Sequence, residues 1–498
     1  MSPGGSNVMN RRLLAFAVLL GAFLRIFHLG SQSIWGDEAL TLQKYAAGGS
    51  LAEVLSLIWR NAFHPPLYFV LAHYWYLLGQ SEFMLRFPSA VFGIAAILVI
   101  YLLARRLFPS PAPGLAALIL AVSPFHIWYS QEARMYSLQV LLALGSMLFF
   151  LRAWESRRPT DFALYAALTV MGLFTHLGTL LLVAAQGAFV LGAVAKDWRR
   201  YAIWLGVQAM ALIAFLPWIL RFIEGNRGPI GYQREASLLH LGYGLYTFSV
   251  GYSFGPSVSS LHYLPSKQVI AECLPAIAAS AVVFGLLAVF GLVYAYRANR
   301  AGFWFLSSHL FIPLALVGVA SLLPNVPLNA RYLMVAVVPY VIVLALGAQV
   351  CLRAGALRLL PASAVLLAAL SLYNHYFDPA YAKQDMRSAV RLVNMEAKSG
   401  DVVIISSIEL GGPFIYYFNR EDVPYVGYPP RVGLVKPERV AGDLAEILRN
   451  KKRAWLILGR TWSSDPHGLI LKTLETRYAL VKRRAYSGVT VSCFRLPS

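Results

Sequence analysis

The segment PPLYFVLAHYWYLLG (residues 65–79) decides how this chain is threaded through a membrane. The segment is apolar, but it is short for a helix that crosses a hydrocarbon core of roughly 30 Å, which takes about 20 residues. Apolar segments of this length are more often interfacial or re-entrant. We therefore predict that residues 65–79 form a helix along the membrane surface.

The composition around this segment is that of a polytopic membrane protein. Of the 498 residues, 58% are hydrophobic and 13% are charged, and the mean hydropathy is +0.59. Soluble domains are about a quarter charged. The first apolar run has no small-residue cleavage site after it and is interpreted as a retained span. We predict a polytopic α-helical protein with eleven transmembrane helices, at 12–29, 87–104, 113–129, 137–152, 161–176, 177–194, 201–220, 272–296, 303–322, 333–350 and 357–374.

The positions of Lys and Arg indicate the orientation. If residues 65–79 do not cross, most basic residues of the short loops fall on one side of the membrane: Arg11, Arg12, Arg105, Arg106, Arg152, Arg157, Arg158, Lys196, Arg199, Arg200, Arg297, Arg300, Arg353 and Arg358. Such an excess marks the cytoplasmic side. We therefore expect a cytoplasmic N-terminus, an extracytoplasmic C-terminus and a long first external loop, residues 30–86. The net charge of +20 is largely this topology signal, and we expect no nucleic-acid partner.

The last quarter of the chain has a different character. Residues 376–498 contain 19 Lys and Arg and 12 Asp and Glu. DVVIIS (401–406) and AWLILG (454–459) are typical of buried strands, and PERVAGDLAEILRN (437–450) is typical of an amphipathic helix. We predict a membrane domain of residues 1–375 followed by a small extracytoplasmic α/β domain.

Two adjacent carboxylates follow the first predicted span. Asp37 and Glu38 lie in SIWGDEALT, beside Trp35, a residue type that anchors chains at the membrane interface. They suit the first turn of a helix, where acids complement the helix dipole. That explanation accounts for one acid more easily than for two, and we predict that Asp37 and Glu38 are catalytic residues of a site at the outer membrane boundary.

Other polar residues are expected on the same side of the membrane. Each also has a purely structural explanation, such as a local ion pair between Glu132 and Arg134 or an Arg331 side chain that snorkels to the headgroups. The candidates are Glu132 as a second catalytic acid, and His64, Arg331, Arg134 and Tyr136 as substrate-binding residues.

Several motifs, in order along the chain, resemble those of one enzyme family. They are WGDEA, HPPLYF, LRFPSAVFG, YSQEARMYSL, RYLM and, at the start of the tail, KQDMRSAV. The set resembles the bacterial membrane glycosyltransferases of the dolichyl-phosphate-mannose-protein mannosyltransferase type, and the lipid A aminoarabinose and galacturonic acid transferases are similar. The likeness covers residues 1 to about 375, while the tail motif resembles one bacterial subset.

This resemblance implies a GT-C fold and inverting transfer of a sugar from a polyprenyl-phosphate donor to a protein or lipid acceptor on the outer face. It implies that Asp37 is the catalytic base and Glu132 the second acid, and that Arg331 lies near the carrier phosphate. The chemistry fits the residue types. A carboxylate takes the proton of an attacking hydroxyl, typically for a gain of 10²–10⁴-fold, and a cation stabilises a phosphate leaving group. The alternative function is a polytopic transporter or lipid flippase, although transporters bind near the midplane through broken helices.

A divalent metal is left open as a cofactor. In the aminoarabinose branch of the resembling family, a glutamate in the place of His64 takes part in a zinc site. His64 with His240 or His262 and a carboxylate would suit Zn²⁺, although the ligands would come from distant segments. Cys273, Cys351 and Cys493 are too far apart in sequence to suggest a disulfide framework or a zinc cluster.

Overall fold

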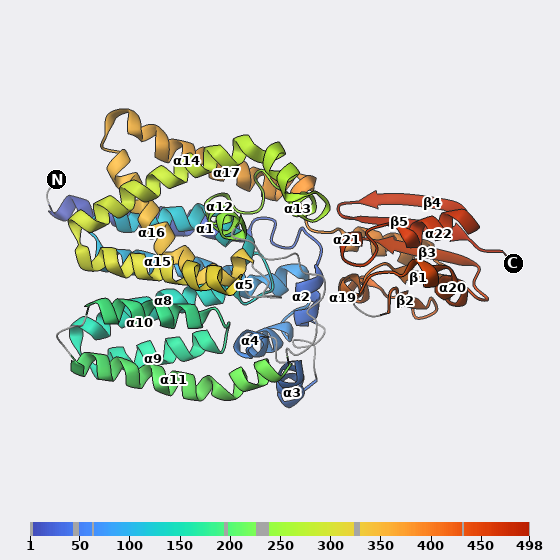
Figure 1. The fold of residues 1–498 in the computed structure, drawn as a ribbon, viewed down its shortest axis with the longest axis horizontal. Coiled ribbons are helices and arrows are strands. Elements are labelled where there is room, and N and C mark those ends of the chain that lie inside the picture. The colour runs from blue at the N-terminus through green and yellow to red at the C-terminus, as the bar shows by residue number, and fades with distance from the viewer. Residues whose placement is uncertain are drawn as a thin grey trace.

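The computed structural model describes residues 3–42, 49–61, 64–193, 198–225, 239–322, 329–430 and 433–497. The chain forms a helical body and, beyond it, a small domain built on a β-sheet (Figure 1). The helices of the body are α1 (Pro3–Ile26), α2 (Gly36–Thr41), α3 (Leu51–Asn61), α4 (Leu67–Tyr76), α5 (Glu82–Leu107), α6 (Ala112–Val122), α7 (Pro124–Ser130), α8 (Tyr136–Ser156), α9 (Pro159–Leu173), α10 (Thr179–Ala193), α11 (Trp198–Gly225), α12 (Leu239–Val250), α13 (Val258–Tyr263), α14 (Ser266–Ala298), α15 (Arg300–Ala320), η2 (Ala330–Leu333), α16 (Met334–Cys351), η3 (Gly355–Arg358) and α17 (Leu359–Phe377).

Seven helical segments of the described chain are long and apolar enough to cross a membrane: Glu82–Leu107, Tyr136–Ser156, Trp198–Glu224, Ser266–Ala298, Arg300–Ala320, Ala330–Cys351 and Gly355–Phe377. Together, α6 and α7 would make an eighth, although they are bent by 57°. The predicted number of eleven is therefore not confirmed. The helices α9 and α10, at two of the predicted spans, have 15 residues each.

The predicted span at 113–129 coincides with two helices that are bent by 57°, so whether it crosses as one span is not confirmed. It breaks between α6 and α7, where Pro124 has no N–H to continue the helical ladder. The side chain of Ser123 accepts a hydrogen bond from the His126 N–H at 3.3 Å and so caps the second helix. This break turns α7 toward the loop that carries Glu132.

The apolar segment 65–79, on which the predicted topology depends, forms the short helix α4. With ten residues, α4 is too short to cross a hydrocarbon core. Tyr68 and Phe69 are buried, and the Leu67 N–H donates to the Phe174 carbonyl at 2.9 Å. The expected helix is therefore present and is packed against the body, and its position along the membrane surface stays a prediction.

The helix α16 is the centre of the body. It is apolar all round, which is typical of a helix surrounded by other helices, and nearly all of its residues are buried. A Cβ atom at Gly347 would collide with the Leu287 carbonyl, and one at Gly291 with the Val343 carbonyl. Small residues at these two positions let α14 and α16 approach to backbone contact, as membrane helices commonly do.

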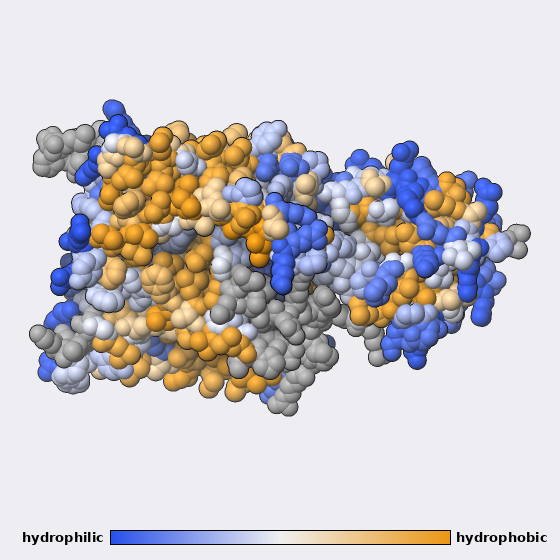
Figure 2. Space-filling view, turned by 45° about the horizontal axis from the view of Figure 1, so that its top comes forward, coloured by the Kyte–Doolittle hydropathy of each residue, from blue (hydrophilic) through white to orange (hydrophobic). Residues whose placement is uncertain are grey.

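The outer surface of the body is suited to lipid. Hydrophobic residues cover it in a broad band, and hydrophilic residues gather at its end far from the sheet domain and on the sheet domain (Figure 2). Contiguous exposed apolar surface of this extent is unusual for a protein in water. The chain is a multi-pass membrane protein.

The C-terminal domain holds a five-stranded mixed sheet. Its elements are η4 (Pro379–Tyr381), α18 (Met386–Glu396), β1 (Val402–Ile405), α19 (Ile408–Tyr417), β2 (Tyr425–Gly427), α20 (Pro437–Ile447), β3 (Arg453–Leu458), α21 (Thr461–Ser464), α22 (Leu469–Arg477), β4 (Ala479–Tyr486) and β5 (Val489–Arg495). The strand order is β2-β1-β3-β5-β4, with β1 parallel to β2 and β3, and β5 antiparallel to β3 and β4. The two predicted strands are β1 and β3, and the predicted amphipathic helix is α20.

Candidate functional site

The helix α2 lies at the end of the helical body that faces the sheet domain (Figure 1), and the predicted site residues gather around it. Asp37 and Glu38 lie on α2, Glu132 and Arg134 lie between α7 and α8, and Arg331 lies on η2. Asp37 and Arg331 are 294 residues apart in sequence, yet their side chains form an ion pair. The fold therefore joins the segment that carries α2 to the start of the central helix α16.

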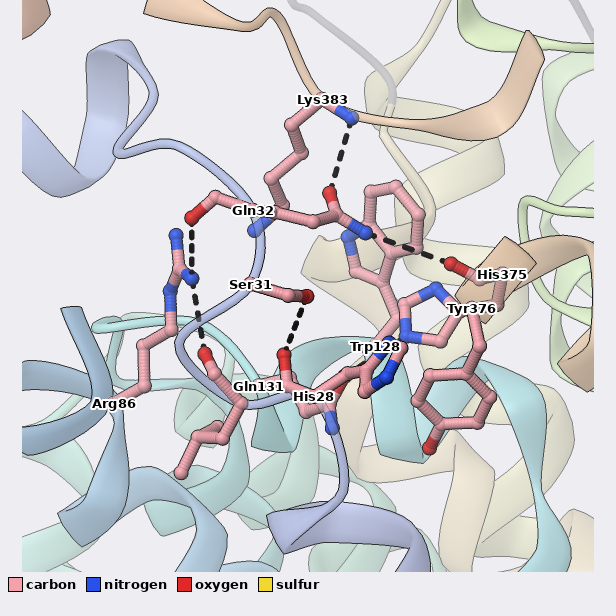
Figure 3. A pocket seen from close by; sticks show the side chains of 10 residues that line it. His28, Ser31, Gln32, Arg86, Trp128, Gln131, His375, Tyr376 and Lys383 are labelled. Carbon is pink, nitrogen blue, oxygen red and sulfur yellow. Dashed lines mark hydrogen bonds between the residues drawn. The ribbon is translucent and has the colours of Figure 1, made fainter. Parts of the chain in front are cut away.

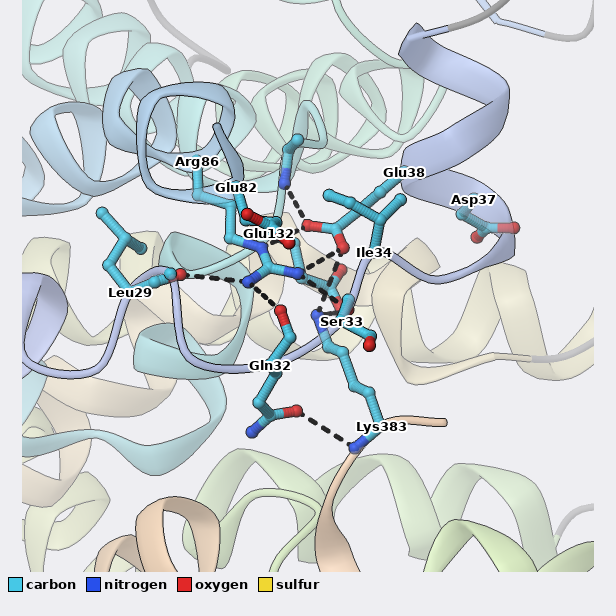
Figure 4. A network of polar contacts seen from close by, with 12 residues as sticks. Leu29, Gln32, Ser33, Ile34, Asp37, Glu38, Glu82, Arg86, Glu132 and Lys383 are labelled. Carbon is cyan, nitrogen blue, oxygen red and sulfur yellow. Dashed lines mark hydrogen bonds and ion pairs between the residues drawn. The ribbon is translucent and has the colours of Figure 1, made fainter. Parts of the chain in front are cut away.

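Asp37 is the accessible carboxylate of the pair singled out in the sequence. Its Oδ2 accepts a hydrogen bond from Arg331 Nη1 at 2.8 Å, and 31% of the Asp37 side chain is exposed. Asp37 points away from the buried contacts made by Glu38 (Figure 4). Asp37 can therefore meet a ligand that enters from outside the protein.

Arg331 is held at the N-terminal end of the central helix. The Asn329 side chain accepts a hydrogen bond from the Arg331 N–H at 3.1 Å and so caps η2. The guanidinium lies 5.9 Å from the ring centre of Tyr136 and 5.7 Å from that of Tyr332, within the range of cation–π attraction. Arg331 thus lies on a capped, partly buried turn that leads into α16.

Arg134 connects the remaining candidates. Its Nη1 donates to the Asp37 carbonyl at 3.3 Å and to Thr41 Oγ1 at 3.2 Å, and its Nη2 lies 3.1 Å from His64 Nε2. Its guanidinium lies 5.8 Å from the Tyr136 ring centre. With 2% of its surface exposed, Arg134 is a buried cation that brings α2, His64 and α8 together.

The electrostatics around Asp37 favour its ionised form. Burial acts to raise the pKa of Asp37, but Arg134 and Arg331 outweigh it and lower the pKa to about 2. Desolvation lowers the pKa of His64 well below its ordinary value, and the nearby Arg134 and His176 lower it further. Asp37 is therefore a carboxylate and His64 a neutral imidazole at neutral pH.

Glu38 has a different environment from Asp37. Its two carboxylate oxygens accept from Arg86 Nε and Nη2, both at 2.8 Å, and Oε1 also accepts from the Ala133 N–H at 2.9 Å (Figure 4). The Glu38 side chain is fully buried. Because both of its oxygens are used and none of it is exposed, Glu38 orders the site from within.

Glu132 is also buried, with 2% of its side chain exposed. Its Oε1 lies 3.2 Å from Lys383 Nζ, which in turn lies 4.0 Å from Glu38 Oε2. Burial raises the pKa of Glu132, while Lys383 acts in the opposite direction. The predicted second acid therefore belongs to a buried group of charges and has a lysine partner.

Sequence reasoning did not single out Arg86 or Lys383. Arg86 is a charged residue within α5, a helix that is otherwise strongly apolar, and such a residue usually has a buried partner. Lys383 lies in the KQDMRSAV motif. Both signals were present, but the partner of each cation comes from a distant segment.

The metal prediction finds little support among the residues that can be placed. No group of three or more His, Cys, Asp or Glu residues suited to a metal ion occurs in the described part of the chain. His64 faces the cation Arg134, and the His262 ring stacks on Trp462 with ring centres 4.0 Å apart. His240 is the second residue of α12, and its side chain lies outside the described residues.

A small cavity lies beside Lys383, lined in part by Gln32, Trp128, Gln131 and His375 (Figure 3). His375 Nε2 and Gln131 Oε1 are 2.9 Å apart across its wall. The cavity has room for about one water molecule. It is too small to be a substrate site and belongs to the packing around the buried charges.

Part of the chain matches a known protein family. Residues 63–220 match the family model described as dolichyl-phosphate-mannose-protein mannosyltransferase. No curated protein sequence matches the chain.

Solved structures share the fold over nearly the whole chain. ArnT from Cupriavidus metallidurans in the apo state is 13% identical, with a TM-score of 0.57, over 99% of this chain and 98% of that chain. The same enzyme bound to undecaprenyl phosphate is 14% identical, with a TM-score of 0.55 and the same coverage. The oligosaccharyltransferase AglB from Archaeoglobus fulgidus, in complex with an inhibitory peptide and a dolichol-phosphate, is 14% identical, with a TM-score of 0.53, over 97% of this chain and 74% of that chain.

At these identities the structural likeness establishes the fold, and the family match concerns residues 63–220. The helical body, the bent helix pair and the C-terminal sheet domain are all included in the alignment with ArnT. The chain has a GT-C fold like that of ArnT, and its residues 63–220 are similar to the dolichyl-phosphate-mannose-protein mannosyltransferase family.

Proposed function

We propose that this protein transfers a sugar from a polyprenyl-phosphate donor to a protein or glycolipid acceptor outside the cytoplasm, with Asp37 as the general base. The observation that carries the proposal is the partly exposed ion pair between Asp37 and Arg331, with Arg134 beside it, at the end of the helical body. A carboxylate next to two cations suits a reaction in which a hydroxyl loses a proton and a phosphate leaves. The relatives bound to undecaprenyl phosphate and to dolichol-phosphate support the class of donor.

In the proposed reaction, Asp37 accepts a proton and Arg331 stabilises the leaving phosphate. The acceptor hydroxyl attacks the anomeric carbon and gives its proton to Asp37, while the bond from that carbon to the phosphate oxygen breaks. The sugar changes configuration, and the carrier leaves with the bonding electron pair as a lipid phosphate. Arg331 stabilises the charge that develops on this phosphate, since charge-assisted hydrogen bonds to phosphate are strong.

The charge balance favours a donor with a single phosphate. Arg134 and Arg331 carry two positive charges against the one negative charge of Asp37, and the group of Glu38, Arg86, Glu132 and Lys383 is neutral as a whole. A lipid-phosphate-sugar diester brings one negative charge and would neutralise the excess around Asp37. A diphosphate-linked donor would bring two.

The remaining candidates take supporting roles in this proposal. His64 and Tyr136 flank Arg134 and would line the bound donor. Glu38 and Glu132, both buried and paired, would hold Asp37 and Arg134 in place without touching the substrate. The transporter alternative is disfavoured, because the charges lie at one end of the body and the family match is to transferases.

The proposal includes the predicted orientation, with a cytoplasmic N-terminus, eleven crossings and an extracytoplasmic C-terminus. The bias of Lys and Arg in the loops supports it. The short helices α9 and α10 would be two of the crossings. The site would then lie on the outer face of the membrane, where the sheet domain stands.

Transfer assays with purified protein in lipid vesicles test the function. A panel of polyprenyl-phosphate-linked hexoses and pentoses is offered as donors, and Asp37→Asn is compared with wild type. Asp37→Asn should lose transfer by at least about 10²-fold while remaining folded. The matched control is Asp422→Asn, which removes an exposed carboxylate paired with Arg420 in the sheet domain and should retain activity. Turnover of nucleotide sugars without any lipid-linked donor, or normal transfer by Asp37→Asn, would overturn the proposal.

A further inference from the structure

Four buried charges from four separate segments meet beneath Asp37 (Figure 4). They are Glu38 on α2, Arg86 on α5, Glu132 in the loop before α8, and Lys383 after α17. Their side chains are between 0% and 9% exposed. Two positive and two negative charges balance each other, which is a requirement for ions that are removed from water.

Lys383 is the member that comes from the C-terminal domain. Its ammonium lies 3.2 Å from Glu132 and 4.0 Å from Glu38, and 5.6 Å and 5.5 Å from the ring centres of Trp35 and Trp128. Its backbone N–H donates to Gln32 Oε1 at 3.0 Å. Both the side chain and the backbone of Lys383 are therefore fixed against the first external segment.

Neighbouring residues of the same tail brace that segment further. Arg387 donates to the Gly30 carbonyl at 3.0 Å and to Glu82 at 2.9 Å, and Asp385 accepts from Ser33 Oγ at 3.1 Å. The Tyr417 hydroxyl, on α19, accepts from the Ile34 N–H at 2.8 Å. The loop that leads into α2 is thus held by the C-terminal domain along its length.

The buried charges are connected to the reacting groups by one short path. Glu38 accepts from the Ala133 N–H at 2.9 Å, and this bond fixes the 131–135 loop against α2. The next residue, Arg134, contacts the Asp37 carbonyl and Thr41. A shift of the charges would therefore move Arg134 relative to Asp37.

We propose that Lys383 is a positioning residue for sugar transfer, whose ammonium balances Glu38 and Glu132 and so holds the 131–135 loop, with Arg134, against Asp37. The C-terminal domain is then a working part of the transferase. In this proposal Lys383 does not touch the donor, because its side chain is 9% exposed and its ammonium is paired with the buried Glu132. The inference rests on the proposed function, since the reaction that is positioned is the one assigned to Asp37.

The test combines thermal unfolding with steady-state kinetics. Lys383→Met, Glu132→Gln and the double variant are compared with wild type, and Lys472→Met, which removes an exposed lysine on α22, is the matched control. Each single variant leaves one buried charge unbalanced and should lower the midpoint of unfolding. The double variant restores the balance, so it should unfold at a higher temperature than Lys383→Met.

The kinetic constants of Lys383→Met distinguish a role in positioning Arg134 from a role in binding the donor. Lys383→Met should lower kcat by about 10- to 100-fold, the effect of a displacement of about 1 Å at a catalytic group. The donor KM should change less than about threefold, because Arg331 belongs to the separate segment η2–α16. An unchanged kcat, or a raised KM with normal kcat, would overturn the inference.

If Lys383→Met does not fold, the double variant carries the test. Its unfolding midpoint is then compared with that of Glu132→Gln, and a midpoint that is no higher would overturn the proposed charge balance. If no lipid-linked donor is turned over at all, the proposed function fails while the unfolding comparison still reports on Lys383.

Discussion

Replacing Arg331 with glutamine should change the pH dependence of the reaction. The pKa of Asp37 is lowered from 3.8 to about 2, because Arg134 and Arg331 outweigh the opposing effect of burial. A pKa lowered by about two units corresponds to about 2.5 kcal/mol in favour of the carboxylate. Because 31% of the Asp37 side chain is exposed, solvent screens part of this, and about 1 to 2 kcal/mol is the working value.

The sign of the effect follows from the direction of the shift. The folded protein holds Asp37 ionised at a lower pH than the unfolded chain does, so this contribution to stability is present above about pH 4 and is lost as the pH falls toward about 2. Arg331→Gln removes one charge and the 2.8 Å hydrogen bond and leaves burial and Arg134. The pKa of Asp37 should therefore rise by about one to two units.

The assay measures kcat/KM and kcat as functions of pH. The profile of kcat/KM reports the pKa of Asp37 in the free enzyme, and the profile of kcat reports its pKa in the complex with the donor. In Arg331→Gln the acidic limb of kcat/KM should lie about one to two pH units above that of wild type. In wild type, the acidic limb of kcat should lie above that of kcat/KM, because the donor phosphate draws Arg331 away from Asp37 and makes the carboxylate a stronger base.

Arg420→Gln is the control for this prediction, because it removes an arginine from an exposed pair with Asp422, far from the site. Its pH profile should match that of wild type. If the acidic limb of Arg331→Gln coincides with that of wild type, the ion pair does not control Asp37. An equal displacement in Arg420→Gln would show that the change is not specific to the site.

The buried ion pair, the orientation and the metal question can each be tested separately. Glu38→Gln breaks a fully buried ion pair with Arg86 and should lower the free energy of unfolding by about 3–5 kcal/mol. The loss is measured by unfolding in denaturant, and an unchanged stability would exclude a structural role for Glu38. A reporter enzyme that is active only outside the cytoplasm should be active when fused after residue 498, and an inactive fusion would contradict the orientation. If a metal bound through His64 supports transfer, dialysis against a chelator should remove both metal and activity, and His64→Ala should abolish metal binding; full activity in metal-free protein would limit His64 to its contact with Arg134.

Features set by local sequence were predicted well. The ten residues of α4 fail to cross a membrane because of their length, and β1, β3 and α20 follow from short apolar patterns. The gathering of Asp37, Glu132 and Arg331 at one end of the body follows from the number of predicted spans that precede each residue. That number places each of them at the outer end of a predicted span.

Features set by distant contacts were not predictable from the sequence. Asp37 and Glu38 are adjacent and chemically alike, and what separates them is that Glu38 points inward to Arg86 while Asp37 points outward to Arg331. The side that each carboxylate faces depends on the placement of α5 and η2. The bend between α6 and α7 was missed because the apolar pattern continues through Pro124.

The position of Lys383 bears on how the protein is made. A chain is synthesised from its N-terminus, so Glu38, Arg86 and Glu132 are in place long before Lys383, which follows the last helix of the body. Until that residue arrives, the buried acids outnumber their cations and the loop with Arg134 lacks part of its support. Domains generally fold as units during synthesis. An unfinished or truncated chain would therefore remain without transferase activity in the membrane. The enzyme would become able to transfer a sugar only as the final domain docks.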